Sequence, residues 1–284
     1  MLIAQITDIH LGFDPVDPDE LNRRRLDVVL ATLTAMSPRP DLLLATGDLV
    51  EDGFDDVSYQ RLRDLLADLP FPVHFALGNH DSRSDFLAWF PEAETAGGYL
   101  QYAIEDYPVR ILVLDTLDEG RHGGTFCEAR ATWLRDRLAE QPDRPTIIAL
   151  HHPPIETGLS WMTENPDAEW VLRLWDVVAG ADNIVAMIAG HLHRPVVTQW
   201  AGTTLAICPS TAPQVALDLE PIDPEQPDGR PMIIADQPWF GLHLWTGCGL
   251  VSHFDTAGEH NVIASYGPNL QPLVRMLVEE KEQI

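Results

Sequence analysis

The chain of 284 residues has little positive charge: 18 Lys and Arg stand against 44 Asp and Glu, for a net charge of −26. Lys281 is its single lysine. A surface this acidic repels the phosphate backbone of DNA and RNA, whose binding normally depends on Lys and Arg. We therefore expect no nucleic-acid polymer among the substrates. A small anion remains possible if the site itself concentrates positive charge, as metal ions do.

Cysteine is scarce, and long apolar runs are missing. Cys127, Cys208 and Cys248 are an odd number without metal-type CxxC spacing, so we expect free thiols in a reducing cytosol; one disulfide and one free thiol is the alternative. No apolar run reaches about 18 residues, which predicts no membrane span. The chain opens directly on an apolar strand without a cationic leader, and we expect a cytoplasmic protein.

Short apolar runs alternate with amphipathic stretches through the first two thirds of the chain. This alternation predicts an α/β fold with a largely parallel sheet flanked by helices. The expected strands are Leu2–Ile6, Leu42–Ala45, Val73–Leu77, Ile111–Leu114, Thr146–Leu150 and Ile184–Ile188. The expected helices are Glu20–Met36, Val57–Leu69, Glu128–Leu138 and Ala168–Val178. Within this pattern Tyr99–Glu105 and Val109–Leu114 predict an antiparallel hairpin.

The last third of the chain has a different character. Its expected strands are Val196–Trp200, Thr203–Ile207, Trp239–Trp245, Leu250–Phe254 and Val262–Tyr266, with a final helix near Leu270–Glu280. Residues 217–231 carry four prolines and five acids, which is typical of an extended linker. A lid near the active site or a subunit contact is the alternative for this segment.

Polar side chains follow five of the apolar runs, at the point where each run ends. The carboxyl ends of parallel strands meet at one edge of a sheet, so these side chains should converge. The stretches are TDIH (Asp8, His10), TGD (Asp48), GNHD (Asn79, His80, Asp81), HHPP (His151, His152) and GHLH (His191, His193). Each alone is a weak signal; five at the same kind of junction are not explained as solvated turns.

Carboxylates, imidazoles and an amide oxygen, without thiolate, suit divalent ions of intermediate hardness such as Mn, Fe, Co or Zn. Gly47, Gly78 and Gly190 precede the polar residues in three of the stretches. Glycine suits loops that turn sharply and approach a metal or a phosphate closely. The sequence therefore predicts a metal site at the edge of the sheet.

The ordered series of motifs resembles the calcineurin-like metallophosphoesterase superfamily. HHPP and GHLH resemble its branch of class III cyclic-nucleotide phosphodiesterases and bacterial glycerophosphodiesterases. The resemblance implies a four-layer α/β/β/α sandwich. It covers residues 8–193, and we expect a catalytic domain over 1–208. A β-rich C-terminal extension over 209–284 would complete the sandwich and cap the site or form a dimer.

The resemblance also implies two divalent ions. One would be held by Asp8, His10, Asp48 and His193, and the other by Asp48, Asn79, His151 and His191, with Asp48 bridging. The implied reaction is in-line attack of a metal-bridging hydroxide on a phosphodiester. His80 would protonate the leaving oxygen or bind the phosphoryl group, and Asp81 would orient His80. His152 would pack beside His151 or contact the substrate.

The second motif narrows the substrate. Family members that cleave phosphoprotein monoesters carry Arg where Asp52 stands here, so a monoanionic diester fits better than a dianionic monoester. Glycerophosphodiester-like substrates are the first expectation and cyclic AMP is the alternative; a phosphomonoesterase or a non-catalytic scaffold ranks lower. For His243, His253 and His260 we expect surface or core positions; a contribution to a lid near the metals is the alternative. A homodimer or higher oligomer is expected.

Overall fold

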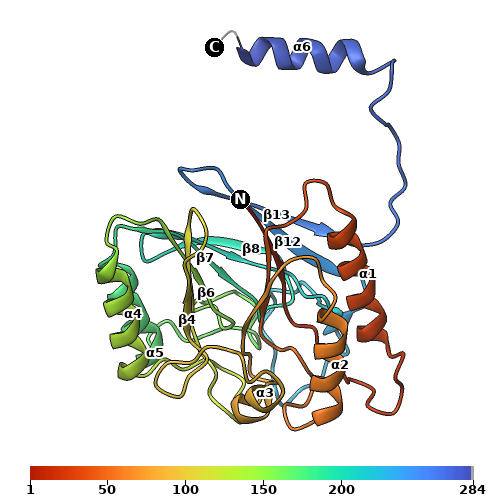
Figure 1. The fold of residues 1–284 in the computed structure, drawn as a ribbon. Helices are drawn as coiled ribbons and strands as arrows, with labels where there is room; N and C mark the ends of the chain where they lie inside the picture. The colour runs from red at the N-terminus through yellow and green to blue at the C-terminus, as the bar shows by residue number, and fades with distance from the viewer. Residues whose placement is uncertain (283–284) are drawn as a thin grey trace.

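The computed structural model describes residues 1–282 and places two β-sheets face to face between two layers of helices (Figure 1). This is the expected α/β/β/α sandwich. The first sheet has the order β13-β12-β1-β2-β3, and the second has the order β4-β5-β6-β7-β9-β8. Each sheet has a parallel centre, so the strands that precede the polar motifs end at the same edge of the molecule.

The first sheet combines the N-terminal strands with two strands from the end of the chain. β12 pairs antiparallel with β1, with His243 opposite Ile3, and β13 forms the outer edge. The strands are β1 (Leu2–Ile6), β2 (Leu42–Thr46), β3 (Val73–Ala76), β12 (Trp239–Trp245) and β13 (Leu250–Thr256). The C-terminal strands therefore share a sheet with the strands that carry the first motifs.

The second sheet begins with the expected hairpin of β4 and β5 and continues with parallel pairs. Its strands are β4 (Tyr102–Ile104), β5 (Arg110–Val113), β6 (Thr146–Ala149), β7 (Ile184–Ala189), β8 (Val196–Trp200) and β9 (Thr203–Ile207). β10 (Gln214–Val215) and β11 (Ile233–Ile234) form a separate two-stranded ladder. Residues 216–232 connect them as a loop.

Helices cover the outer face of each sheet. The structure has α1 (Leu21–Ala35), α2 (Asp56–Leu66), α3 (Arg83–Trp89), α4 (Glu128–Glu140), α5 (Glu169–Val178) and α6 (Gln271–Glu282). Side chains alternate along each strand: Ile111 and Val113 pack between the two sheets, whereas Leu112 and Leu114 pack toward α4 and α5. Both faces are apolar because both are buried, which explains the nearly continuous apolar runs.

One expected strand is absent, and one helix was not expected. Val262–Tyr266 forms no strand, and Ile263 is 94% exposed there, because no partner strand lies beside this segment. The structure also contains α3, which the periodicity did not predict. This helix is short, but Ser82 precedes it as a typical N-terminal cap, because its side chain accepts a hydrogen bond from the Asp85 amide.

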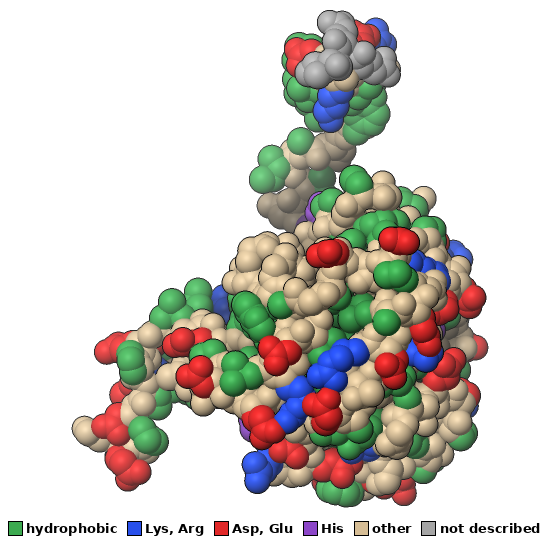
Figure 2. All heavy atoms as spheres, turned by 90° about the vertical axis from the view of Figure 1, so that its left-hand side faces the viewer, with side chains coloured by type: hydrophobic (Ala, Val, Ile, Leu, Met, Phe, Trp, Pro, Cys, Tyr) green, Lys and Arg blue, Asp and Glu red, His purple; other side chains and the backbone are tan. Residues whose placement is uncertain are grey.

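The exterior carries both charge signs. Figure 2 shows Asp and Glu side chains dispersed among Arg side chains on the face that carries α4 and α5, with α6 standing clear of the body. The three cysteines are free, as expected. Over residues 1–282, no helix combines the length and apolarity needed to cross a bilayer.

Candidate metal centre

The five polar motifs meet at the carboxyl ends of β1, β2, β3, β6 and β7. The backbone there is unusual: the structure records six non-glycine residues with positive φ, and five of them lie in these motifs. They are Asp8, His10, Asp48, His191 and His193, with φ between 47° and 73°. A positive φ is uncommon for residues other than glycine, although Asp and His adopt it more readily than most, and such conformations cluster at functional sites.

One half of the cluster is formed by His10, His193, Asp8 and Asp48. The Nε2 atoms of His10 and His193 lie only 3.2 Å apart. His193 Nε2 lies 3.4 Å from Asp8 Oδ1, and His10 Nε2 lies 3.7 Å from Asp48 Oδ2. The ligand atoms of Asp8, His10 and His193 all lie within 4.8 Å of one another. This geometry suits a single ion held in common.

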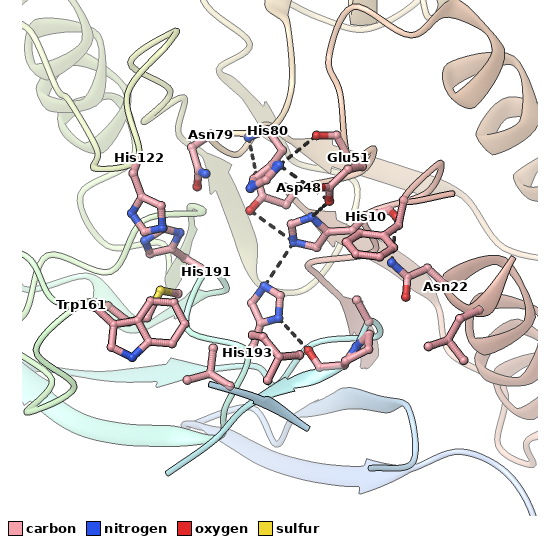
Figure 3. A pocket seen from close by; sticks show the side chains of 17 residues that line it. His10, Asn22, Asp48, Glu51, Asn79, His80, His122, Trp161, His191 and His193 are labelled. Atoms are coloured by element: carbon pink, nitrogen blue, oxygen red, sulfur yellow. Dashed lines mark hydrogen bonds and ion pairs between the residues drawn. The ribbon is translucent and has the colours of Figure 1, made fainter. Parts of the chain in front are cut away.

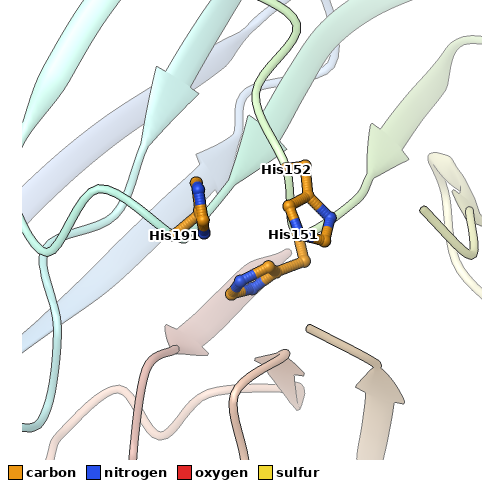
Figure 4. A group of neighbouring side chains, drawn as sticks. All are labelled: His151, His152 and His191. Carbon is orange, nitrogen blue, oxygen red and sulfur yellow. The ribbon is translucent and has the colours of Figure 1, made fainter. Parts of the chain in front are cut away.

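The other half is built on His151. Its Nε2 atom lies 3.3 Å from Asp48 Oδ2 and 4.0 Å from Asp8 Oδ1, so both carboxylates face both halves. His191 and His152 lie beside it, with the His151 and His191 ring centroids 5.1 Å apart (Figure 4). Asp48 therefore lies between His10 and His151, the place that a bridging ligand requires.

Buried polar atoms without hydrogen-bond partners show whether the half of the cluster around His151 fits a metal ion. Asn79 Oδ1, His151 Nε2 and His152 Nε2 are buried and form no hydrogen bond within the described residues. Leaving such atoms unpaired costs about 1–3 kcal/mol each, so native structures rarely do so without a partner such as an ion or water. Two of the three atoms belong to expected ligands, and an ion would satisfy them.

Three of the four expected histidine ligands are held with Nε2 directed at the centre. The Nδ1 atoms of His10, His151 and His193 each lie 2.8 Å from an acceptor, namely the Glu51 carboxylate, the Thr46 carbonyl and the Pro213 carbonyl. An Nδ1–H that donates outward leaves the Nε2 lone pair directed at the centre. Such outer partners orient metal-binding imidazoles.

The glycines are explained by the ligands themselves. A Cβ at Gly78 would lie 2.3 Å from Asp48 Oδ1 and 2.6 Å from His151 Nε2, and one at Gly47 would lie 2.4 Å from His151 Nδ1. Neither position has room for a side chain. Glycine is required because the loops that carry the expected ligands pack against one another, not only because the chain turns.

The electrostatics of the centre favour a cation. Burial of His151 lowers its pKa, but the neighbouring carboxylates of Asp48 and Asp8 outweigh this effect and raise the pKa to about 9. At His10, burial lowers the pKa, but the hydrogen bond to Glu51 and the charge of Asp48 raise it more, so the pKa of His10 is raised overall. Two buried carboxylates thus attract positive charge, which protons or metal ions can supply.

His80 and Asp81 have different surroundings from those expected. His80 Nδ1 lies 2.9 Å from the Glu51 carbonyl, and its backbone amide donates to Asp48 Oδ1. Asp81 accepts from the Leu49 and Gly78 amides instead of contacting the His80 ring. Burial, and then the Asp48 charge, raise the pKa of Asp81 to about 6. Glu51, rather than Asp81, is placed to orient His80.

A cavity of about 330 Å³ opens over the cluster (Figure 3). Apolar side chains form much of its wall, among them Phe13, Trp161, Met162 and Ile233. His122 and Glu51 also line it. Neither His122 nor Glu51 was expected from the sequence, since His122 lies in the loop before α4 and Glu51 follows Asp48 by three residues.

The remaining expected positions lie elsewhere. His243 is fully buried and lies 2.8 Å from both Gln5 Oε1 and Ser252 Oγ. His253 and His260 are exposed. Loop 216–232 contacts the segment that carries Trp161, through a hydrogen bond from the Ile222 amide to Ser160 Oγ.

Comparisons with known proteins agree with this geometry. A family model described as calcineurin-like phosphoesterase matches residues 1–195. A probable cyclic nucleotide phosphodiesterase of Rhodopseudomonas palustris is 36% identical over 77% of this chain and 81% of its own. A glycerophosphodiester phosphodiesterase of Enterobacter lignolyticus is 30% identical over 94% of this chain and 94% of its own. A dimetal phosphatase from Danio rerio shares the fold, with TM-score 0.58 and 16% identity over 91% of this chain and 99% of its own.

Proposed function

Because the chain belongs to the calcineurin-like phosphoesterase family, we propose that it hydrolyses small phosphodiesters at a centre holding two divalent ions. Glycerophosphodiesters are the first candidate substrates. The similarity to the enzyme from Enterobacter lignolyticus, which spans 94% of both chains, supports this choice. The observation that carries the proposal is the position of Asp48 Oδ2 between His10 Nε2 and His151 Nε2.

The proposed ligands fall into two sets that share one carboxylate. The first set is Asp8, His10, Asp48 and His193; the second is Asp48, Asn79, His151 and His191. When bound, such a pair of ions polarises phosphoryl oxygens and lowers the pKa of water. Manganese, iron, cobalt and zinc all suit oxygen and imidazole donors.

The other polar residues would hold the substrate and the loops. His80 is proposed to contact the leaving oxygen, because its ring lies at the cavity wall and its Nδ1 atom is already held by Glu51. Asp81 would keep the Asp48 and Asn79 loops together through its backbone hydrogen bonds. His152 lies against Thr116 Oγ1, 2.9 Å away, and is proposed to position the loop that follows β5.

The charge of the cavity supports a diester over a monoester. No Lys or Arg is among the residues found to line it, and Glu51 adds a carboxylate. A dianionic monoester would therefore have only the metal ions as counter-charge. A monoanionic diester carries one negative charge fewer and therefore needs less positive counter-charge.

Cyclic nucleotides are the second candidate. Trp161 and Phe13 line the cavity and offer flat apolar faces on which a base can stack. The similarity to the probable cyclic nucleotide phosphodiesterase of Rhodopseudomonas palustris supports this alternative.

Hydrolysis of bis(p-nitrophenyl) phosphate with added Mn²⁺, before and after chelation, tests the proposal. We expect turnover that disappears on chelation, returns with metal and exceeds turnover of p-nitrophenyl phosphate. Asp48→Ala is the control, because it removes the shared ligand. A panel of glycerophosphocholine and cyclic AMP then separates the two substrate classes. Failure of metal-loaded protein to hydrolyse the diester above the Asp48→Ala background would contradict the proposal.

A further inference from the structure

His122 is an imidazole in the cavity wall that the proposed ligand sets do not include. It lies in the segment between β5 and α4, and its ring centroid is 4.7 Å from that of His191. On the other side of the cluster, the His80 ring lies 4.5 Å from that of His10 (Figure 3). Since His10 and His191 belong to opposite halves, the two remaining imidazoles flank the space between them.

The segment that carries His122 is anchored at several points. His152 Nδ1 lies 2.9 Å from Thr116 Oγ1, and the Thr125 amide donates to the Thr116 carbonyl. The Gly124 amide donates to Glu164 Oε1 at 2.9 Å, and a Cβ at Gly124 would lie 2.8 Å from His152 Cβ. The buried HHPP turn therefore holds the backbone on both sides of His122, and the imidazole is directed to the cavity.

His122 is not placed as a metal ligand. The groups of His, Asp and Glu whose ligand atoms lie within 4.8 Å of one another, within residues 1–282, do not include it. Its ring also forms no hydrogen bond with any side chain or backbone group that the structure describes, so its N–H is available to a bound molecule.

We propose that His122 is a substrate-contacting residue that donates a hydrogen bond to the second ester group of a phosphodiester. This inference rests on the proposed function. A diester has two ester oxygens, and imidazoles on both sides of the cluster can contact one each. A monoester has a single ester oxygen, so one of the two contacts is lost. His122 would thus select diesters over monoesters.

The test compares His122→Ala with wild-type protein on two substrates. For bis(p-nitrophenyl) phosphate we expect kcat/KM to fall about 10- to 100-fold, the range for a lost substrate hydrogen bond. For p-nitrophenyl phosphate we expect a change of less than about twofold. Metal content, measured by mass spectrometry, should not change. His122→Gln, which keeps an N–H donor, should recover part of the diester activity.

Two further variants separate contact from structure. His253→Ala replaces an exposed histidine on β13, away from the cavity, and should leave both substrates unaffected. Thr116→Val removes the hydrogen bond to His152 and should lower the ratio of diester to monoester activity in the same direction as His122→Ala, by a smaller factor. An active His122→Ala enzyme with the wild-type ratio would contradict only the role of His122. Inactive wild-type protein would contradict the proposed function as well.

Discussion

At the scale of single residues, the proposed metal centre contains histidines whose protons would compete with a metal ion. The pKa of His151 is raised to about 9, so at pH 7 His151 carries a proton when no metal is present, and the raised pKa of His10 favours its protonated form as well. A metal ion must displace these protons. Metal affinity should therefore rise as the pH rises toward 9 and fall as the pH drops.

Calorimetric Mn²⁺ titrations at pH 7, in buffers of different ionisation enthalpy, measure this release. We expect about one to two protons released per protein on saturation. Asp48→Ala should release fewer, because the carboxylate that raises the pKa of His151 is gone. Binding without proton release would contradict the arrangement.

Substitution of Glu51 tests whether the groups that hydrogen-bond to the expected ligands orient them for metal binding. Its carboxylate holds His10 Nδ1 at 2.8 Å. We expect Glu51→Ala to weaken metal binding about 10- to 100-fold, the usual effect of losing such a partner. Glu92→Ala, which removes an exposed carboxylate paired with Arg63, is the matched control. Equal metal affinities in the two variants would rule out the orienting role.

The convergence of the expected ligands was predictable because they follow apolar runs directly. Asp8, Asp48 and His191 are placed by strand ends, which the sequence pattern marks. His122 and Glu51 were not predictable, because their positions depend on how loops pack against HHPP and against His10. The expected link from Asp81 to His80 failed for the same reason, since backbone amides occupy that carboxylate.

At the scale of elements, the tight loops after the strands are as specific as the ligands. Gly78→Ala would place a Cβ 2.3 Å from Asp48 Oδ1, so we expect loss of metal binding. Gly249→Ala is the control, because a Cβ there meets nothing within 4 Å. Metal content and circular dichroism of both variants are the measurements. Wild-type metal content in Gly78→Ala would show that the loops can move apart.

The pairing of β12 with β1 makes stability depend on pH. Burial lowers the pKa of His243 from 6.5 to about 4, because the folded protein favours the neutral imidazole. The contribution of this neutral imidazole to stability is therefore complete above pH 6.5 and is lost as the pH falls toward 4. When the pH is lowered from 6.5 to 5, the free energy of unfolding of the wild-type protein should fall by about 2 kcal/mol more than that of the His243→Asn variant. Urea unfolding at both pH values measures this. His260→Asn, which replaces an exposed histidine, should retain the wild-type pH dependence.

Strands and helices with clear periodicity were predicted to within a few residues, because burial on both faces makes an apolar run. The failed strand at Val262–Tyr266 has the right composition and no neighbour to pair with. Strand propensity records packing against neighbours, which a single segment does not reveal. The order β13-β12-β1 likewise could not be read from local pattern.

At the scale of the whole molecule, α6 stands apart from the body (Figure 1). Its Leu273, Met276 and Leu277 are 47–49% exposed. We expect a chain ending at Gly258 to keep the thermal midpoint and the diester activity of the full chain at low protein concentration. A drop in the midpoint of more than about 4 °C would show that α6 packs on the body in solution. The oligomeric state, the cytoplasmic location and the capping role of residues 209–284 stay predictions.

The central claim is that side chains from five strand ends hold a pair of cations. Anomalous diffraction from crystals grown with Mn²⁺ tests it directly. We predict two peaks about 3.5–4 Å apart, one near His10 and His193 and one near His151 and His191, with Asp48 between them. A map without peaks at this cluster, or with peaks only elsewhere, would contradict the account.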